Sequence, residues 1–209
     1  MTEKPLTIAV LGAGNVGSTL GKKWHVGGYQ VRFGVRDPDG KHAQALRNAF
    51  GDQTTIGTIG DALQGGPEVV LVALPGAVVE AIAQEYAAKL NGRIILDAAN
   101  RMGADSLHNL ASFQQYAPQA HLYRAFNTLG WESFAEPRFD GIEADLFYCG
   151  PEGDARTTVE QLIGSIGLRP VYLGGVEQMG LLDSIATLWF TLALGQKKGR
   201  HLAFKVLGD

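Results

Sequence analysis

Apolar runs and amphipathic segments follow one another along the first two thirds of the chain. Short apolar runs predict strands, and apolar residues spaced three and four apart predict helices. Strands are expected at 8–11, 29–35, 53–56, 68–75, 93–100 and 122–126. Helices are expected at 18–26, 41–50, 60–63, 77–90 and 106–116. This alternation predicts the α/β class, with an open parallel sheet and right-handed crossovers.

The last third of the chain has a different rhythm. Residues 129–142 are rich in aromatic residues and proline and are expected to form a loop. Strands are expected at 145–150 and 169–173, and helices at 154–167 and 179–194. The pattern therefore predicts a short α+β extension after the sheet.

A glycine-rich turn, Gly12 to Gly17, directly follows the first apolar run and precedes the first expected helix. Its spacing, G-x-G-x-x-G, is typical of dinucleotide binding in this strand–turn–helix context. We expect Gly12 to make the tight turn, Gly14 to let the backbone approach a pyrophosphate, and Gly17 to let the helix pack on the strand. The helix N-terminus then offers N–H groups to the phosphates. The alternative is a turn without a ligand, since 28 of the 209 residues are glycine.

With this motif the predicted fold becomes a Rossmann-type, doubly wound parallel sheet with a short α+β C-terminal extension. We expect a single domain over residues 1–209, of a length that can bury a core. The nucleotide-binding core is expected at about 5–128. Residues 129–209 are expected to complete the acceptor side and to provide a candidate dimer contact.

The end of the second expected strand determines which dinucleotide is preferred. An NAD site usually has an acidic residue there, which accepts from the ribose 2′-hydroxyl. This chain has Arg36 instead, whose planar fork suits a 2′-phosphate, and Lys41 follows closely. Asp37 would repel a phosphate if it pointed inward. The pattern favours NADP over NAD, and the alternative is a solvated Arg36 paired with Asp37 or Asp39.

Three other strands end at the edge where the crevice is expected, and polar residues follow two of them. Residues 73–76 should line the crevice, because strand ends at this edge face the cofactor. Asn100, Asn127 and Thr128 end the next two strands, and an Asn amide can orient a nicotinamide carboxamide or a substrate carbonyl. The alternative is that these side chains only tie loops together. Trp131 is a candidate stacking face for a planar ring, or a core or dimer-contact residue.

Composition excludes several classes of function. The net charge is −3, and Lys197 to Arg200 is too short a basic stretch for a nucleic-acid binder. The single Cys149 excludes an internal disulfide framework and a cysteine zinc cluster, and is expected to be a packing residue. We expect neither a signal peptide nor a membrane span, and therefore a cytoplasmic protein.

The chain offers few reactive side chains. The five histidines are scattered without metal-ligand spacing, so we expect no metal site and no catalytic acid or base. A hydride-carrier site without an acid–base pair favours an acceptor that takes hydride directly. Flavin-like rings do so, because the ring delocalises the charge and the protein holds two planes together.

Several motifs resemble one family in the family's order: VLGAGNVG, FGVRDP, VVLVALP, IILDAAN and RAFNT, with AFKVL after the closing helix. The chain resembles the NADPH:coenzyme F420 oxidoreductases, F420 being a deazaflavin, and is more distantly similar to the NADPH domain of membrane ferric reductases. The resemblance implies a pyrophosphate at 13–16, a 2′-phosphate at Val35 and Arg36, and a ribose and nicotinamide at Leu74 and Pro75. It also implies that Asn100 and Ala125 contact the nicotinamide. Val35 replaces the serine common in the family, which removes one hydroxyl donor.

Residues and resemblance together predict an oxidoreductase that transfers hydride between NADP(H) and a flavin-like or F420-type acceptor. The predicted cofactor-binding residues are Gly12, Ala13, Gly14, Asn15, Val16, Val35, Arg36, Lys41, Ala73, Leu74, Pro75, Asn100 and Ala125. The predicted substrate-binding residues are Asn127, Thr128 and Trp131. Two alternatives stay open: a non-catalytic NADP(H) sensor, and a pyrroline- or imine-type reductase. The partners expected are a small-molecule acceptor, for which a quinone or an iron chelate would also fit, and a second copy. The apolar segment 181–194 is a candidate contact for that second copy, and the alternative is that it is buried in its own subunit.

Overall fold

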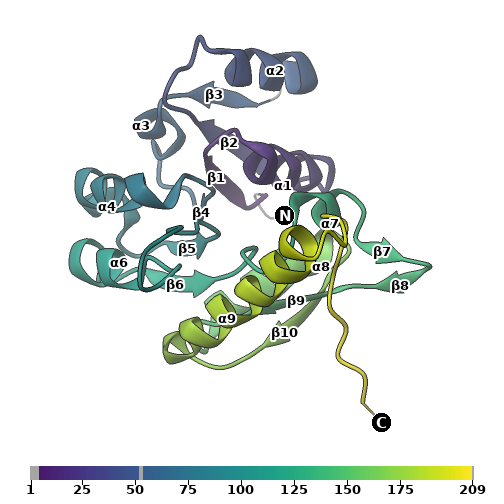
Figure 1. The fold of residues 1–209 in the computed structure, drawn as a ribbon. Helices are drawn as coiled ribbons and strands as arrows, with labels where there is room; N and C mark the ends of the chain where they lie inside the picture. The colour runs from purple at the N-terminus through teal and green to yellow at the C-terminus, as the bar shows by residue number, and fades with distance from the viewer. Residues whose placement is uncertain (1–4, 52–53, 209) are drawn as a thin grey trace.

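Alternate residues of the first strand face two different hydrophobic clusters, one on each side of a six-stranded sheet. Ile8 and Val10 belong to one cluster, and Ala9 and Leu11 belong to the other. A strand covered on both faces is expected in a parallel sheet with helices on either side, and Figure 1 shows this layering. The computed structural model describes residues 5–51 and 54–208.

The sheet is parallel throughout, with strand order β3-β2-β1-β4-β5-β6. Its strands are β1 (Thr7–Leu11), β2 (Gln30–Gly34), β3 (Thr55–Gly57), β4 (Val69–Val72), β5 (Ile94–Asp97) and β6 (His121–Arg124). The order reverses between β1 and β4, which creates the crevice where such sheets bind ligands. The predicted Rossmann-type sheet is thus confirmed. One residue of the expected third strand, Gln53, lies outside the described residues.

The helices around the sheet are α1 (Asn15–Val26), α2 (Lys41–Phe50), α3 (Ile59–Ala62), α4 (Gly76–Glu85), α5 (Ala87–Leu90) and α6 (Leu110–Tyr116). The single helix predicted over 77–90 is wrong. Tyr86 leaves helical geometry at φ −107° and ψ 19°, and its side chain packs against the second cluster. The helix predicted from residue 106 begins only at Leu110, because the Leu107 carbonyl accepts from the Arg101 N–H and not from a following turn of helix.

The extension contains more regular structure than the sequence predicted. The expected loop 129–142 holds α7 (Trp131–Ala135) and a hairpin of β7 (Arg138–Phe139) and β8 (Ile142–Glu143). Asp140 and Gly141 both adopt positive φ at the turn, the backbone that a two-residue hairpin requires. The prediction of a loop there was therefore wrong.

The remaining elements of the extension are β9 (Asp145–Tyr148), α8 (Asp154–Ser165), β10 (Arg169–Tyr172), a 3-10 turn η2 (Val176–Gln178), α9 (Met179–Phe190) and a π-helical segment η3 (Thr191–Gly195). The helix expected over 179–194 thus changes to π geometry after Phe190. β9 and β10 pair in parallel. Backbone hydrogen bonds between Arg124 and Cys149, of 2.9 and 3.1 Å, join the extension to β6.

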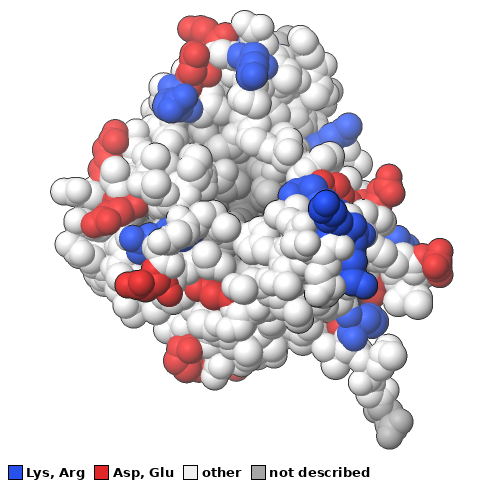
Figure 2. All heavy atoms as spheres, in the orientation of Figure 1, with Lys and Arg blue, Asp and Glu red and all other residues white. Residues whose placement is uncertain are grey.

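The surface carries charges of both signs. Figure 2 shows acidic and basic side chains mixed over one face, with cations gathered where α9 ends and the C-terminal segment begins. Among the residues that the structure describes, no helix is long and apolar enough to cross a membrane.

Candidate cofactor-binding crevice

The glycine turn has the geometry that its spacing predicts. Gly12 has φ +107°, and a β-carbon on it would lie 2.3 Å from the carbonyl oxygen of Ala73. A β-carbon on Gly17 would lie 2.1 Å from the carbonyl oxygen of Gly12. A β-carbon on Gly14, in contrast, would meet nothing within 4 Å. The fold therefore requires glycine at the first and third positions, and the second leaves space beside the backbone.

The N-terminus of α1 is open to an anion. Its N-cap is Gly14, which has no side chain to cap the helix, and its first turn carries no acidic residue. The positive end of the helix dipole is therefore not neutralised by the chain itself, which favours a phosphate there. The Ser18 hydroxyl donates back to the carbonyl of Gly14 at 2.8 Å, so it leaves the first-turn N–H groups of Asn15 and Val16 uncovered.

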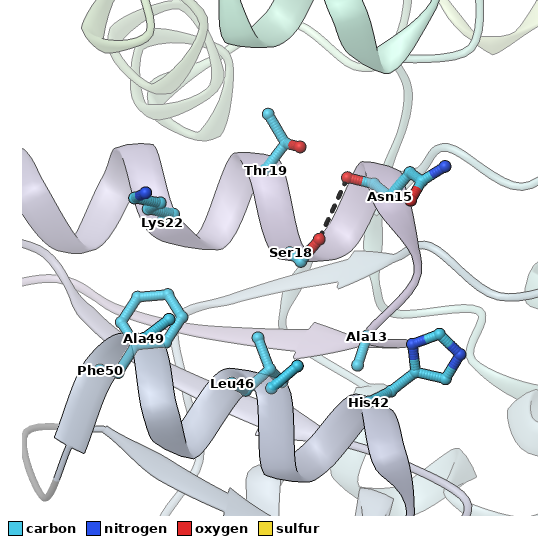
Figure 3. A pocket seen from close by; sticks show the side chains of 10 residues that line it. Ala13, Asn15, Ser18, Thr19, Lys22, His42, Leu46, Ala49 and Phe50 are labelled. Atoms are coloured by element: carbon cyan, nitrogen blue, oxygen red, sulfur yellow. Dashed lines mark hydrogen bonds between the residues drawn. The ribbon is translucent and has the colours of Figure 1, made fainter.

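A hollow of about 250 Å³ opens between α1 and α2, next to the glycine turn. Figure 3 shows Ser18 of α1 directed toward Leu46 of α2, with His42 beside Ala13. The sequence analysis assigned no site role to His42. The structure places it at the mouth of this hollow.

Arg36 is exposed just beyond β2 and has no hydrogen bond or ion pair with any described residue. The Asp37 carboxylate instead accepts from the N–H of Asp39 at 3.1 Å, within its own turn. The alternative in which Arg36 is paired with Asp37 or Asp39 is therefore not seen. Lys41 is exposed at the start of α2. The side chain of Val35 is buried, so only its backbone is available to a ligand.

The segments that follow β1, β4 and β5 touch one another. The Ala73 N–H donates to the Leu11 carbonyl at 2.9 Å, and the Ala73 carbonyl crowds Gly12. A β-carbon on Gly76 would lie 2.5 Å from the carbonyl oxygen of Asn100. Leu74 is half-buried and Pro75 is exposed between these two contacts. The structure thus brings the predicted residues 12–16, 73–75 and Asn100 to one edge of the sheet.

Two buried polar side chains after β6 have no partner. Asn127 is 5% exposed, and neither its Nδ2 nor its Oδ1 has a hydrogen-bond partner among the described residues. The Thr128 hydroxyl is also buried and has no hydrogen-bond partner among the described residues. Buried polar groups are normally paired, so unpaired ones need an explanation. An unpaired amide that can donate and accept fits a ligand with a carbonyl or amide edge.

The backbone before these residues is strained. Phe126 has φ +63°, in the left-handed region that a bulky residue seldom adopts, and its buried ring meets Trp24 and Phe134 edge-on. Such strain persists where the surroundings enforce it, and it clusters at functional sites. Ala125 is fully buried, so only its backbone is available to a ligand. Trp131 is half-buried against the first hydrophobic cluster at the start of α7.

Sequence reasoning missed a buried charged network beneath the crevice. Arg124 is fully buried and lies 3.2 Å from a carboxylate oxygen of Asp97 and 3.2 Å from one of Asp183. Burial raises the pKa of the Asp97 carboxyl, against the opposing effects of Arg124 and the hydrogen bonds from Asn109 and Ala99. The available signal was a charge in two otherwise apolar runs, IILD and LYRAF.

Comparison with known proteins agrees with this geometry. Residues 7–101 match the family model described as NADP oxidoreductase, coenzyme F420-dependent. The family resemblance is confirmed. A structure from Arthrobacter sp. FB24, described as an F420-dependent NADP reductase, superposes with a TM-score of 0.82 at 25% identity, covering 96% of this chain and 99% of that chain. Over residues 7–101 the chain is thus similar to a family of NADP-dependent oxidoreductases.

Two further relatives share less. A glycerol-3-phosphate dehydrogenase [NAD(P)+] from Pseudomonas syringae pv. syringae is 26% identical over 133 residues, covering 58% of this chain. The chain spans 38% of the length of that relative. An imine reductase from Pseudomonas sp. shares the fold, with a TM-score of 0.67 at 16% identity, covering 93% of this chain and 63% of that one.

Proposed function

We propose that the protein binds NADP(H) in the crevice and transfers hydride between it and a planar flavin-like or deazaflavin acceptor, such as coenzyme F420. The observation that carries the cofactor assignment is the unpaired Arg36 beside an uncapped α1 N-terminus. The N–H groups of the turn at 12–17 can bind a pyrophosphate. The Arg36 guanidinium can bind a 2′-phosphate.

Each part of the crevice has a separate task in this proposal. The N–H groups of 13–16 hold the pyrophosphate, and Arg36 and Lys41 hold the 2′-phosphate. Residues 73–75 form a wall beside the ribose and nicotinamide. Asn100 orients the carboxamide, and the Ala125 backbone contacts the nicotinamide ring. When bound, NADPH supplies a hydride, which the acceptor takes up with a proton from water.

Asn127 and Thr128 carry the acceptor side of the proposal. Their unpaired polar atoms are buried, so a ligand that reaches them exchanges an unsatisfied group for a hydrogen bond. A flavin-type ring has alternating carbonyl and N–H groups along one edge, which match an amide and a hydroxyl. Trp131, which is half-buried at the start of α7, is the proposed stacking face for the acceptor ring.

We further propose a homodimer that packs on the outer face of α9 and η3. Leu181, Leu188 and Leu194 are each about half exposed there. Sedimentation of the wild type and of Leu188→Glu tests this contact. A dimer that the substitution converts to a monomer supports it, and a monomeric wild type overturns it.

The test of the activity is NADPH oxidation, followed optically, with coenzyme F420, FMN, FAD and a ferric chelate offered separately. We expect turnover with a flavin-type acceptor, and faster turnover with NADPH than with NADH. Tight NADPH binding without turnover on any acceptor would overturn the reductase and favour an NADP(H) sensor. Turnover only with a cyclic imine would favour the imine-type reductase.

A further inference from the structure

The side-chain amide of Asn100 is held by a hydrogen bond from Arg124. Arg124 Nη2 donates to Asn100 Oδ1 at 2.6 Å, and the same nitrogen lies 3.2 Å from Asp183 Oδ1. Nη1 donates to the Asp97 carbonyl at 3.2 Å and to the Ala99 carbonyl. The guanidinium is therefore fixed by carboxylates of β5 and α9 and by the backbone that leads to Asn100.

The chemistry of Arg124 settles which way this amide faces. A guanidinium has only donors, so the Asn100 atom that contacts it is the oxygen. The amide nitrogen, Nδ2, is then on the opposite side, and it makes no hydrogen bond with any described residue. Asn100 is itself half-buried beside Gly76, at the edge where the crevice lies.

The loop that carries Asn100 is tied at its far end to the same network. The second carboxylate oxygen of Asp183, Oδ2, accepts from the N–H groups of Leu107 at 2.9 Å and His108 at 3.1 Å. The Arg101 N–H donates to the Leu107 carbonyl at 2.9 Å, which closes the loop. Both the backbone and the side chain of Asn100 are thus placed by groups below the crevice.

We infer that Arg124 is a positioning residue that makes Asn100 a hydrogen-bond donor toward the crevice. This inference rests on the proposed function, because the ligand that reaches Asn100 is then the nicotinamide end of NADP(H). Asn100 Nδ2 donates to the oxygen of the carboxamide and cannot accept from its N–H₂ group. The site therefore selects a ring that carries a carbonyl oxygen and is indifferent to the amide nitrogen.

The binding test compares NADP⁺ with its 3-acetylpyridine analogue, which keeps the carbonyl oxygen and replaces the amide nitrogen by a methyl group. Dissociation constants are measured by calorimetry without an acceptor. We expect wild-type affinities for the two ligands within about 3-fold of each other. An analogue that binds more than about 10-fold more weakly would show that Asn100 accepts, and would overturn the inference.

The variants are Asn100→Asp, Arg124→Gln and the double variant. Asp at position 100 keeps an oxygen for Arg124 and loses the donor, so we expect NADP⁺ to bind about 10-fold more weakly. Arg124→Gln frees the amide, so only one of its two orientations donates to the ligand, and NADP⁺ should bind about 2-fold more weakly. Because Arg124 acts through Asn100, its substitution should weaken NADP⁺ binding no further in the Asn100→Asp background.

The controls separate positioning from stability. Gln161→Glu makes the same amide-to-carboxylate change on the exposed face of α8 and should leave binding unchanged. Additive costs in the double variant, or an Asn100→Asp variant with wild-type affinity, overturn the inference. If Arg124→Gln does not fold, Asp183→Asn takes its place in the cycle. A wild type that binds neither ligand overturns the proposed function itself.

Discussion

A β-carbon on Gly12 would lie 2.3 Å from the carbonyl oxygen of Ala73, so the turn after β1 and the segment after β4 leave room for glycine alone. Gly12→Ala is therefore expected to lower the free energy of unfolding by about 2–4 kcal/mol, through a positive φ and a backbone clash. Urea unfolding measures this loss, and NADPH binding should fall with it.

Gly14→Ala is the matched variant in the same turn. Gly14 has φ −73°, and its β-carbon would meet nothing, so the free energy of unfolding should fall only by the cost of a poorer N-cap residue, about 0.5–1 kcal/mol. The added methyl group lies where the pyrophosphate approaches, so NADPH should bind at least 10-fold more weakly, by a factor worth about 1.4 kcal/mol. Equal NADPH affinity in both proteins would contradict a pyrophosphate at this turn.

Arg36→Ala is expected to weaken the binding of NADPH much more than the binding of NADH. The side chain is exposed and unpaired, so its loss should change stability by less than about 0.5 kcal/mol. The charge-assisted hydrogen bonds to a 2′-phosphate are worth about 1.5–3 kcal/mol, so NADPH should bind about 10- to 100-fold more weakly while NADH changes little. Fluorescence titration with both nucleotides measures the two affinities. An equal loss of affinity for NADPH and NADH would show that Arg36 does not bind the 2′-phosphate.

Thr128→Val is expected to affect turnover and stability in opposite directions. The buried hydroxyl has no hydrogen-bond partner among the described residues, so a methyl group in its place should raise the free energy of unfolding by up to about 1 kcal/mol. Turnover with a flavin-type acceptor should fall about 10-fold, a change of about 1.4 kcal/mol in the barrier.

Thr58→Val provides the control for that comparison. Thr58 caps α3 in a capping box, so its substitution should lower the free energy of unfolding by about 1 kcal/mol. Turnover should be unchanged, because α3 carries none of the predicted site residues. If Thr128→Val instead loses stability and keeps full turnover, Thr128 is not part of the acceptor site.

Asp145 gives the fold a pH dependence. Burial alone would raise the pKa of its carboxyl, but hydrogen bonds from Arg169, Val206 and Lys205 lower it below the ordinary value. The stabilisation is then fully present above the unfolded pKa of about 3.9 and is lost as the pH falls through the folded value. Unfolding at pH 7 and at pH 3 should show that Asp145→Asn destabilises strongly at pH 7 and much less at pH 3. An equal loss at both values would contradict the lowered pKa.

The sequence determined the sheet and the cofactor end of the crevice. Gly12 and Gly17 and the apolar runs impose local geometry, and the strand–turn–helix order then places the turn at one sheet edge. The break at Tyr86 and the hairpin at 138–143 were missed, because both depend on packing and turn dihedrals that short-range patterns do not encode.

Only the tertiary structure decided the chemistry beneath the crevice. Asp97, Arg124 and Asp183 are separated by 27 and 59 residues along the chain, and no motif marks them as a group. They come together because β5 and β6 are neighbours in the sheet and Asp183 of α9 contacts Arg124 at the end of β6. The orientation of the Asn100 amide follows from that meeting, because a hydrogen-bond direction is set by its partner and not by the residue's place in the sequence.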